Sequence, residues 1–196
     1  MKRSVRPALM AFLGLSVVAG VFYPLAVWAM ARILWAPQAE GSLEVRDGRV
    51  VGSRWIGQTF TDPGHFWGRP SATVDARGSA LPCNGANSGG SNLAWGNPAW
   101  SQAVAGRAAA LRAADPDQAA PVPNDLVTTS GSGLDPHIRP ESALYQAHRV
   151  ARCRGLDEAA VRRLVAAHTE GPQWGFLGEA RVNVLELNLA LDTLAR

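Results

Sequence analysis

Residues 7–31 read PALMAFLGLSVVAGVFYPLAVWAMA, a run of twenty-five residues without a charge. A helix of this length rises about 1.5 Å per residue and spans about 37 Å, enough to cross a hydrocarbon core of about 30 Å. Lys2, Arg3 and Arg6 precede the run, whereas Arg32 alone follows it closely. Because short basic flanks stay in the cytoplasm, we expect the N-terminus inside the cell and residues from about 35 onward outside.

A cleaved signal peptide is the alternative interpretation of this run. Ala29-Met30-Ala31 resembles a small-residue cleavage site, and a basic start precedes it. The apolar region of a signal peptide has only about 7–15 residues, so the greater length favours a retained transmembrane helix. Both interpretations export the rest of the chain.

Small residues within the run indicate a packing face. Ser16 and Gly20 are four residues apart, and Gly14 lies on a nearby face. Such spacing lets a second helix approach closely, although small residues are also common in membrane helices generally. We expect Gly14, Ser16 and Gly20 to pack against a partner helix, and Pro24 to kink the span.

The remaining residues, 35–196, are enough for one compact domain with its own core. The net charge of +3 arises from the four basic residues up to Arg32, and 15 basic and 16 acidic residues follow. The exported part is therefore nearly neutral, and its charge gives no reason to expect binding to nucleic acid. We predict that residues 1–34 form a cytoplasmic N-terminus and a transmembrane helix, and that residues 35–196 form a periplasmic or extracellular domain.

This domain combines the signals of strands and of helices. An alternating pattern around Asp47-Gly48 predicts a hairpin of strands 43–46 and 49–54. Caps and periodic apolar residues predict three helices, over residues 98–114, 140–154 and 158–170. Residues 181–187 predict a buried strand, with a short helical tail from residue 188. The predicted fold class is α+β: one transmembrane helix and one mixed α/β domain with long ordered loops.

The densest polar cluster is residues 128–137, TTSGSGLDPH, which holds hydroxyls, a carboxylate and an imidazole. An exported hydrolase would use Ser132 as its nucleophile. The nucleophile-elbow pattern requires glycine at position 130, where this chain has serine. The alternative is a turn whose Ser, Asp and His side chains bond local backbone groups.

Other motifs also lack a catalytic or metal-binding pattern. Residues 88–91, SGGS, are glycine-rich, but no lysine follows them as in a phosphate-binding loop. The four histidines lack metal-ligand spacing, so we expect neither a metal site nor a catalytic residue. Cys83 and Cys153 could pair in an oxidising compartment, but they lie in no cysteine framework, and we predict free thiols.

A series of motifs follows in order along the chain: GQTF at 57–60, FWGRPSA at 66–72, SGGSNL at 88–93, residues 125–137 and VNVLELNLALD at 182–192. Together they resemble the C subunit of the bacterial potassium-transporting P-type ATPase, the Kdp complex, and the resemblance extends from the membrane helix to the C-terminus. Arg139 departs from the family pattern, because Ser or Thr usually precedes the following proline, and a helix cap worth about 1 kcal/mol would be lost.

The resemblance implies an accessory subunit of the bacterial inner membrane, without a cofactor or activity of its own. Its implied partners are a channel-like subunit, a P-type ATPase subunit and a small single-helix subunit, which together move K⁺ inward at the expense of ATP. One implied role is to stabilise assembly and cover the outer mouth of the channel-like subunit. The other is a catalytic chaperone that raises ATP affinity through Gln146. The expected topology favours the first role, because ATP is cytoplasmic and Gln146 would lie outside.

We therefore expect the polar loops to form a docking surface for the channel-like subunit. Residues 57–96 contain turn formers throughout and are too long for a passive connection. The candidate docking residues are Arg69, Pro70, Ser71, Ser88, Gly89, Gly90, Ser91, Asn92, Ser130, Ser132, Asp135 and His137.

Overall fold

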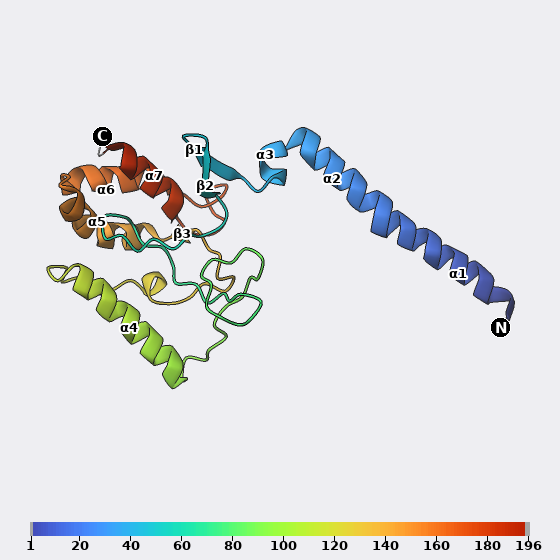
Figure 1. Cartoon of the computed structure of the whole chain (residues 1–196), viewed down its shortest axis with the longest axis horizontal. Coiled ribbons are helices and arrows are strands. Elements are labelled where there is room, and N and C mark those ends of the chain that lie inside the picture. The colour runs from blue at the N-terminus through green and yellow to red at the C-terminus, as the bar shows by residue number, and fades with distance from the viewer. Residues whose placement is uncertain (1, 195–196) are drawn as a thin grey trace. The chain divides into compact units, whose positions relative to one another are not determined.

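The computed structural model describes residues 2–194, which belong to two compact units, residues 1–50 and 51–196. In the first unit, α1 (Lys2–Val17), a π-helical turn (Val18–Phe22) and α2 (Tyr23–Leu34) follow one another without a break (Figure 1). Within Ser4–Leu34, the most apolar window of 18 residues has a mean hydropathy of 2.0, and none of its residues is buried. Within residues 2–194, one helix is therefore long and apolar enough to cross a membrane, by length and composition alone.

The helix continues through Pro24 by means of the π-helical turn. Proline has no N–H to donate and its ring crowds the carbonyl four residues earlier. The turn Val18–Phe22 directly precedes α2, and the N–H of Tyr23 donates to the oxygen of Val18, five residues back. This wider turn accommodates the proline at the start of α2.

After a short helix, α3 (Ala36–Ala39), the predicted hairpin is confirmed. Strand β1 (Leu43–Arg46) pairs with β2 (Arg49–Ser53). Asp47 and Gly48 connect them with φ angles of 49° and 72°. Both angles are positive, as a tight two-residue turn requires.

In the second unit, the cap residues place the first three long helices as predicted. Asn97 accepts a hydrogen bond from the N–H of Ala99 and starts α4 (Pro98–Ala114), and Asp157 does the same for α6 (Glu158–Ala167). Gly155, with a φ of 64°, ends α5 (Pro140–Arg154) in the left-handed conformation. α6 ends three residues earlier than predicted, and a two-residue strand, β4 (Thr169–Glu170), follows it.

The predicted strand over 181–187 is confirmed for its first three residues and wrong for 184–187, which are helical. Strand β5 (Arg181–Asn183) ends after three residues, and α7 (Val184–Leu194) begins at once. The Asn183 side chain accepts from the N–H of Glu186 at 3.1 Å, which caps the first turn of α7. Because Leu187 and Leu191 are both buried, their spacing of four residues belongs to a helix face.

Strand β5 is the centre of a small antiparallel sheet in the order β3-β5-β4, where β3 is His137–Ile138. His137 pairs with Asn183, and Thr169 pairs with Val182. Strands of two residues are too short to show a hydrophobic period, which is why β3 and β4 were not predicted.

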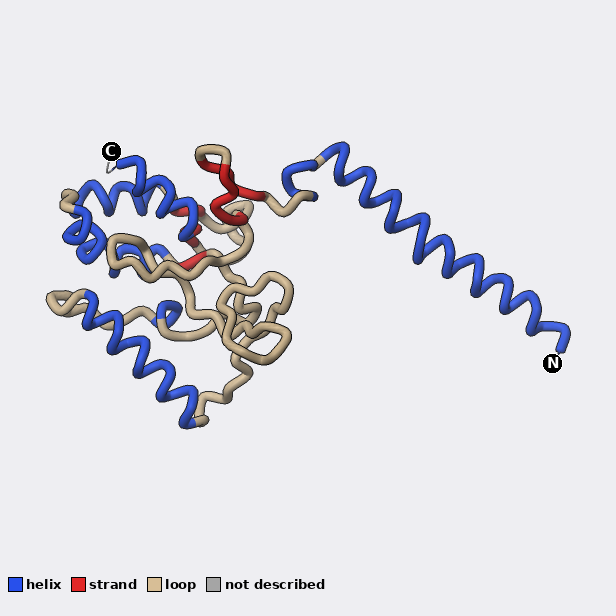
Figure 2. Tube along the Cα trace, viewed as in Figure 1, coloured by secondary structure: helices blue, strands red, loops and turns tan. Residues whose placement is uncertain are grey.

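Helices α5, α6 and α7 enclose the core, and long loops run between them and α4 (Figures 1 and 2). Phe66, from the long loop region, is fully buried among them. The irregular segment 57–96 is therefore anchored in the core at this point. The other fully buried apolar side chains of the described residues are Ala143, Ala147, Val150, Val161, Val165, Val182, Leu187 and Leu191.

The start of α5 shows how the chain compensates for Arg139. Arg139 occupies the cap position without a side-chain cap bond. Asp125, from the short 3₁₀ turn Asn124–Leu126, accepts instead from the N–H of Arg139 at 2.9 Å and from the hydroxyl of Ser142. A carboxylate at a helix N-terminus also interacts favourably with the helix dipole.

Candidate docking surface

The predicted docking residues come from three segments, 69–72, 88–93 and 130–137, which we call the loop cluster. The structure brings these segments together. The carbonyl of Ser132 accepts from the hydroxyl of Ser88 at 3.0 Å and from the N–H of Gly89 at 2.9 Å. The N–H of Ser130 donates to the carbonyl of Pro70 at 3.4 Å. The segments therefore form one ordered structure, although they are up to 60 residues apart in the chain.

The glycines of the loop cluster permit close contact between backbones. Gly133 has a φ of 67°, and a Cβ there would lie 2.5 Å from both the oxygen of Gly89 and Cγ2 of Thr73. A Cβ on Gly90 would lie 3.0 Å from the oxygen of Gly131. Glycine is therefore needed at 133 and fits closely at 90 because the loops pack against each other there, whereas a Cβ on Gly89 would have room.

An ion pair joins two of the three segments. Nη1 of Arg69 lies 3.0 Å from Oδ2 of Asp135, and Nη2 donates to the carbonyl of Thr129 at 3.3 Å. The other oxygen of Asp135 accepts from the N–H of His137 at 3.0 Å. Burial raises the pKa of Asp135, but the hydrogen bonds from His137 and Arg69 and the charge of Arg69 outweigh it, so the pKa is lowered.

The Asp135→Asn substitution should make the free energy of unfolding less dependent on pH under acidic conditions. A carboxyl whose pKa is lower in the folded chain stabilises it above the unfolded pKa of about 3.9. That contribution is lost as the pH falls through the folded pKa. Wild-type stability should therefore fall more steeply below about pH 4 than that of Asp135→Asn. Denaturant unfolding of both proteins from about pH 3 to pH 7 measures this, and parallel profiles would contradict it.

Several predicted docking residues face into the loop cluster. The Ser71 hydroxyl donates to the carbonyl of Gly133 at 2.7 Å and accepts from the N–H of Cys83 at 2.9 Å. Ser130 is buried, whereas Ser88, Asn92 and Ser132 are exposed. The remaining members, Arg69, Pro70, Gly89, Gly90, Ser91, Asp135 and His137, are half-buried.

Ser132 stabilises a local turn, which is the alternative that we gave to a catalytic role. Its hydroxyl accepts from the N–H of Leu134 at 3.1 Å, two residues on. Among the hydrogen bonds of the described residues, none joins Ser132 to a histidine. The arrangement therefore lacks the nucleophile–base contact of a hydrolase.

The amide group of Gln146 makes all of its hydrogen bonds inside the domain. It is 1% exposed, and its amide oxygen accepts from the N–H of Trp67 at 2.8 Å and from Nη2 of Arg149 at 2.7 Å. Its amide nitrogen donates to the carbonyls of Trp67 at 3.0 Å and Ser142 at 3.2 Å. All four hydrogen-bonding positions of the amide are occupied, so none is left for a nucleotide.

Arg149 is the most deeply buried cation of this network. It donates to the carbonyls of Pro63 and His65, and its guanidinium lies 4.2 Å from the centre of the Trp67 ring. Burial lowers the pKa of Arg149 to about 10. Gln146 and Arg149 together tie the long loop to α5, which is a structural role.

Exposed aromatic side chains lie outside the predicted set. Trp174 and Phe176 are 84% and 73% exposed at a turn closed by pairing of Gln173 with Leu177. Trp95 is also 84% exposed. Sequence reasoning missed them, although the absence of charge over residues 171–178 was a visible signal. Exposed apolar groups mark a contact surface where they join into a contiguous patch.

Within residues 2–194, no group of three or more His, Cys, Asp or Glu side chains could hold a metal ion. The two cysteines are free thiols, with Cys83 half-buried and Cys153 exposed. Burial raises the pKa of Cys83. Hydrogen bonds with Thr59 and Ser71 act to lower this pKa, but their effect is smaller. A raised pKa reduces the thiolate fraction, so Cys83 is not an activated nucleophile.

Comparisons with known proteins agree over the length of the chain. The family model of the K⁺-transporting ATPase c chain matches residues 5–193. The potassium-transporting ATPase KdpC subunit of Polaromonas naphthalenivorans (strain CJ2) is 61% identical over 194 residues, covering 99% of this chain and 96% of the relative. That of Dechloromonas aromatica (strain RCB) is 54% identical over 196 residues, covering both chains fully. That of Variovorax paradoxus (strain S110) is 58% identical over 195 residues, covering 100% of this chain and 98% of the relative.

One helix long and apolar enough to cross a membrane, together with the family match, defines the class, a membrane-associated transport subunit. The chain belongs to the family of the K⁺-transporting ATPase c chain. It is a subunit of that ATPase complex and is not catalytic itself.

Proposed function

We propose that this chain is the accessory subunit that stabilises assembly of the K⁺-transporting complex and covers the outer mouth of the channel-like subunit. Residues 1–34 form the cytoplasmic N-terminus and a single span of the bacterial inner membrane, and residues 35–196 lie in the periplasm. Its partners are the channel-like subunit, the P-type ATPase subunit and the small single-helix subunit. The basic residues before the span support this orientation.

The observation that supports this proposal most is that the polar loops bond one another. Their hydroxyl, carboxylate and guanidinium groups bond other loops of the same domain, as Arg69 bonds Asp135 and Ser71 bonds Gly133. Such an arrangement holds a fixed shape and leaves no activated nucleophile. A rigid, loop-rich face with exposed aromatic side chains suits a protein contact.

The catalytic-chaperone role is the second candidate, and Gln146 is where it can be tested. A nucleotide contact at Gln146 would require breaking at least one of four hydrogen bonds in a buried side chain. The proposed topology also places Gln146 on the side of the membrane without ATP. The structure therefore gives this role no support.

Truncation after residue 35 tests the accessory role directly. The remaining helix should still insert, but the complex should co-purify poorly and lose high-affinity K⁺-dependent ATPase activity. The full chain supplied in trans should restore both. If the truncated complex assembles and transports like wild type, the proposed function is wrong.

The Gly20→Leu substitution should loosen the membrane contact. Gly20 lies in the π-helical turn, and beyond its chain neighbours and the backbone of its own helix no atom lies within 4 Å of the position of its Cβ. A leucine there would keep a partner helix from approaching closely. Co-purification in detergent should fall for Gly20→Leu and stay unchanged for Ala26→Leu, which adds the same side chain on another face. Equal recovery of the two variants would remove this face as the contact.

A further inference from the structure

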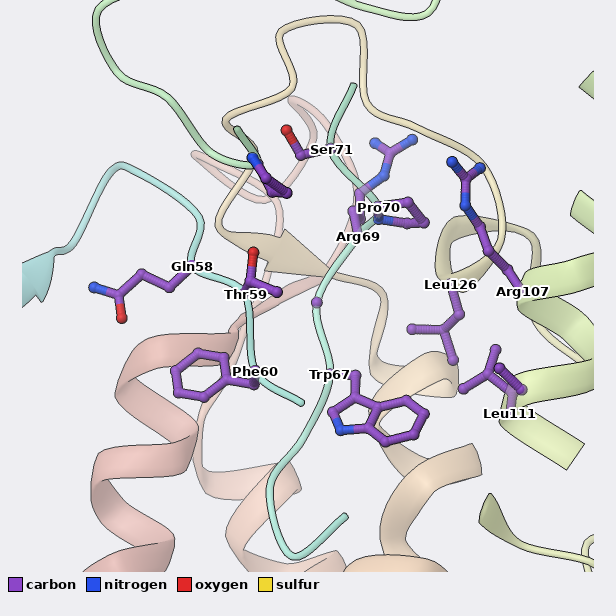
Figure 3. A pocket seen from close by; sticks show the side chains of 13 residues that line it. Gln58, Thr59, Phe60, Trp67, Arg69, Pro70, Ser71, Arg107, Leu111 and Leu126 are labelled. Carbon is purple, nitrogen blue, oxygen red and sulfur yellow. The ribbon is translucent and has the colours of Figure 1, made fainter. Parts of the chain in front are cut away.

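The second unit contains an open groove of about 300 Å³ beside α4 (Figure 3). Residues 58–60 and 67–71 form one wall, and Arg107, Ala110 and Leu111 of α4 form the other, with Pro82 and Leu126 completing it. Its volume is at the lower end of the range for sites that bind small ligands or single side chains.

The two ends of this groove differ in chemistry. The side chains of Phe60, Trp67, Leu111 and Leu126 lie toward one end in Figure 3. The guanidinium groups of Arg69 and Arg107 lie toward the other. An occupant that satisfies both ends must carry an anionic group next to an apolar one.

Arg107 lacks the carboxylate partner that Arg69 has. Its Nη1 donates to the carbonyl of Val127 at 2.9 Å, and no carboxylate of the described residues lies within 4.0 Å of its guanidinium nitrogens. Burial lowers the pKa of Arg107, as for a cation that loses water without gaining a counter-charge. In the same groove wall, Nε of Arg69 is buried with no acceptor among the described residues. Because Nε of Arg69 is enclosed, the remaining guanidinium N–H groups of Arg107 are the donors available for an anion.

We propose that this groove binds a segment of a partner subunit in which a carboxylate lies beside an apolar side chain. The carboxylate bonds Arg107, and the apolar side chain packs between Trp67 and Leu111. This inference rests on the proposed function, since the partner is a subunit of the same complex. A buried carboxylate–Arg contact between subunits supplies specificity as well as attachment.

Protection of a cysteine in the groove wall from chemical modification tests whether the groove is occupied in the complex. In a Cys83→Ser, Cys153→Ser background, cysteine is placed at Ala110, which lines the groove, or at Ala109, the exposed neighbour that does not. Maleimide should modify both equally in the isolated full chain. In the assembled complex, modification at position 110 should slow by about tenfold or more and that at position 109 should not, because a bound segment excludes reagent and water.

Substitution of Arg107 tests the charge. Arg107→Gln should speed dissociation from the detergent-solubilised complex by roughly 30-fold and restore modification at position 110, because the partner carboxylate loses its counter-charge. Arg107→Lys should retain part of the protection. Arg112→Gln, an exposed arginine in the last turn of the same helix, is the matched control and should change neither.

Each other outcome overturns the inference. If the complex assembles and position 110 is modified as fast as in the isolated chain, the groove is empty. If protection persists in Arg107→Gln, the occupant carries no carboxylate to Arg107. If vesicles of anionic lipid protect position 110 in the isolated chain, the occupant is a lipid. Failure of the wild-type chain to join the complex at all would instead contradict the proposed function.

Discussion

The Gly133→Ala substitution should lower the free energy of unfolding by about 3 kcal/mol. A φ of 67° strains a residue with a side chain, at a cost of about 1–3 kcal/mol. The added Cβ would also lie 2.5 Å from the oxygen of Gly89 and from Cγ2 of Thr73, so the loops must separate. Overpacking of this kind adds about 1–3 kcal/mol. Gly133 therefore has the largest expected effect in the loop cluster.

Denaturant unfolding of the full-length chain in detergent, followed by tryptophan fluorescence, measures this change. Gly131→Ala is the matched control in the same segment. No atom lies within 4 Å of its added Cβ, and its φ is not positive. The control should stay within about 0.5 kcal/mol of wild type. Equal stability of the two variants would show that the contact between Gly133 and Gly89 does not hold the loops together.

The Gln146→Ala substitution should lower the free energy of unfolding by about 4 kcal/mol. It removes the partner of the Trp67 N–H and carbonyl and one acceptor for Arg149, all within the domain. Each buried polar group left without a partner costs about 1–3 kcal/mol. The loss should weaken attachment of the long loop to α5, and with it the assembly of the complex.

This variant also separates the two roles considered for the subunit. We expect unfolding at lower denaturant for Gln146→Ala, with any loss of ATPase activity following from lost assembly. Gln102→Ala, on the exposed face of α4, is the control and should behave as wild type. Normal stability and assembly combined with a weaker apparent ATP affinity would instead support a nucleotide contact at Gln146.

Local signals predicted much of the fold. Asn97, Asp157 and Gly155 have side chains or conformations that act within one helical turn, so their positions place the helix ends. The uncharged run predicted the membrane-spanning length in the same way. Such features depend on neighbouring residues alone and can be read without the tertiary structure.

The features that sequence reasoning missed depend on distant residues. Strand β5 ends at Asn183 because that side chain caps α7, whereas Val184 and the leucines that follow had been read as the composition of a buried strand. Asp125 compensates for Arg139 from 14 residues away. Neither contact could be found from local composition.

The candidate site was predicted in part. The three loops were expected to act together, and they do lie together. Ser71 and Ser130, however, are directed into the loop cluster, and the exposed aromatic side chains of Trp174 and Phe176 were not foreseen. Polar, glycine-rich composition indicates an ordered loop but does not say which side chains face outward.

The side of the membrane on which the domain lies is the claim on which the proposed role depends most. In a Cys83→Ser variant, the exposed Cys153 is a native reporter of the domain. A cysteine at Ser4, in the variant that lacks both native cysteines, reports the opposite side.

Modification of these thiols by a membrane-impermeant maleimide in intact spheroplasts tests this topology. We predict that Cys153 reacts before lysis and that the cysteine at position 4 reacts only after it. Reaction of Cys153 only after lysis would place the domain in the cytoplasm and contradict a role at the outer mouth of the channel-like subunit.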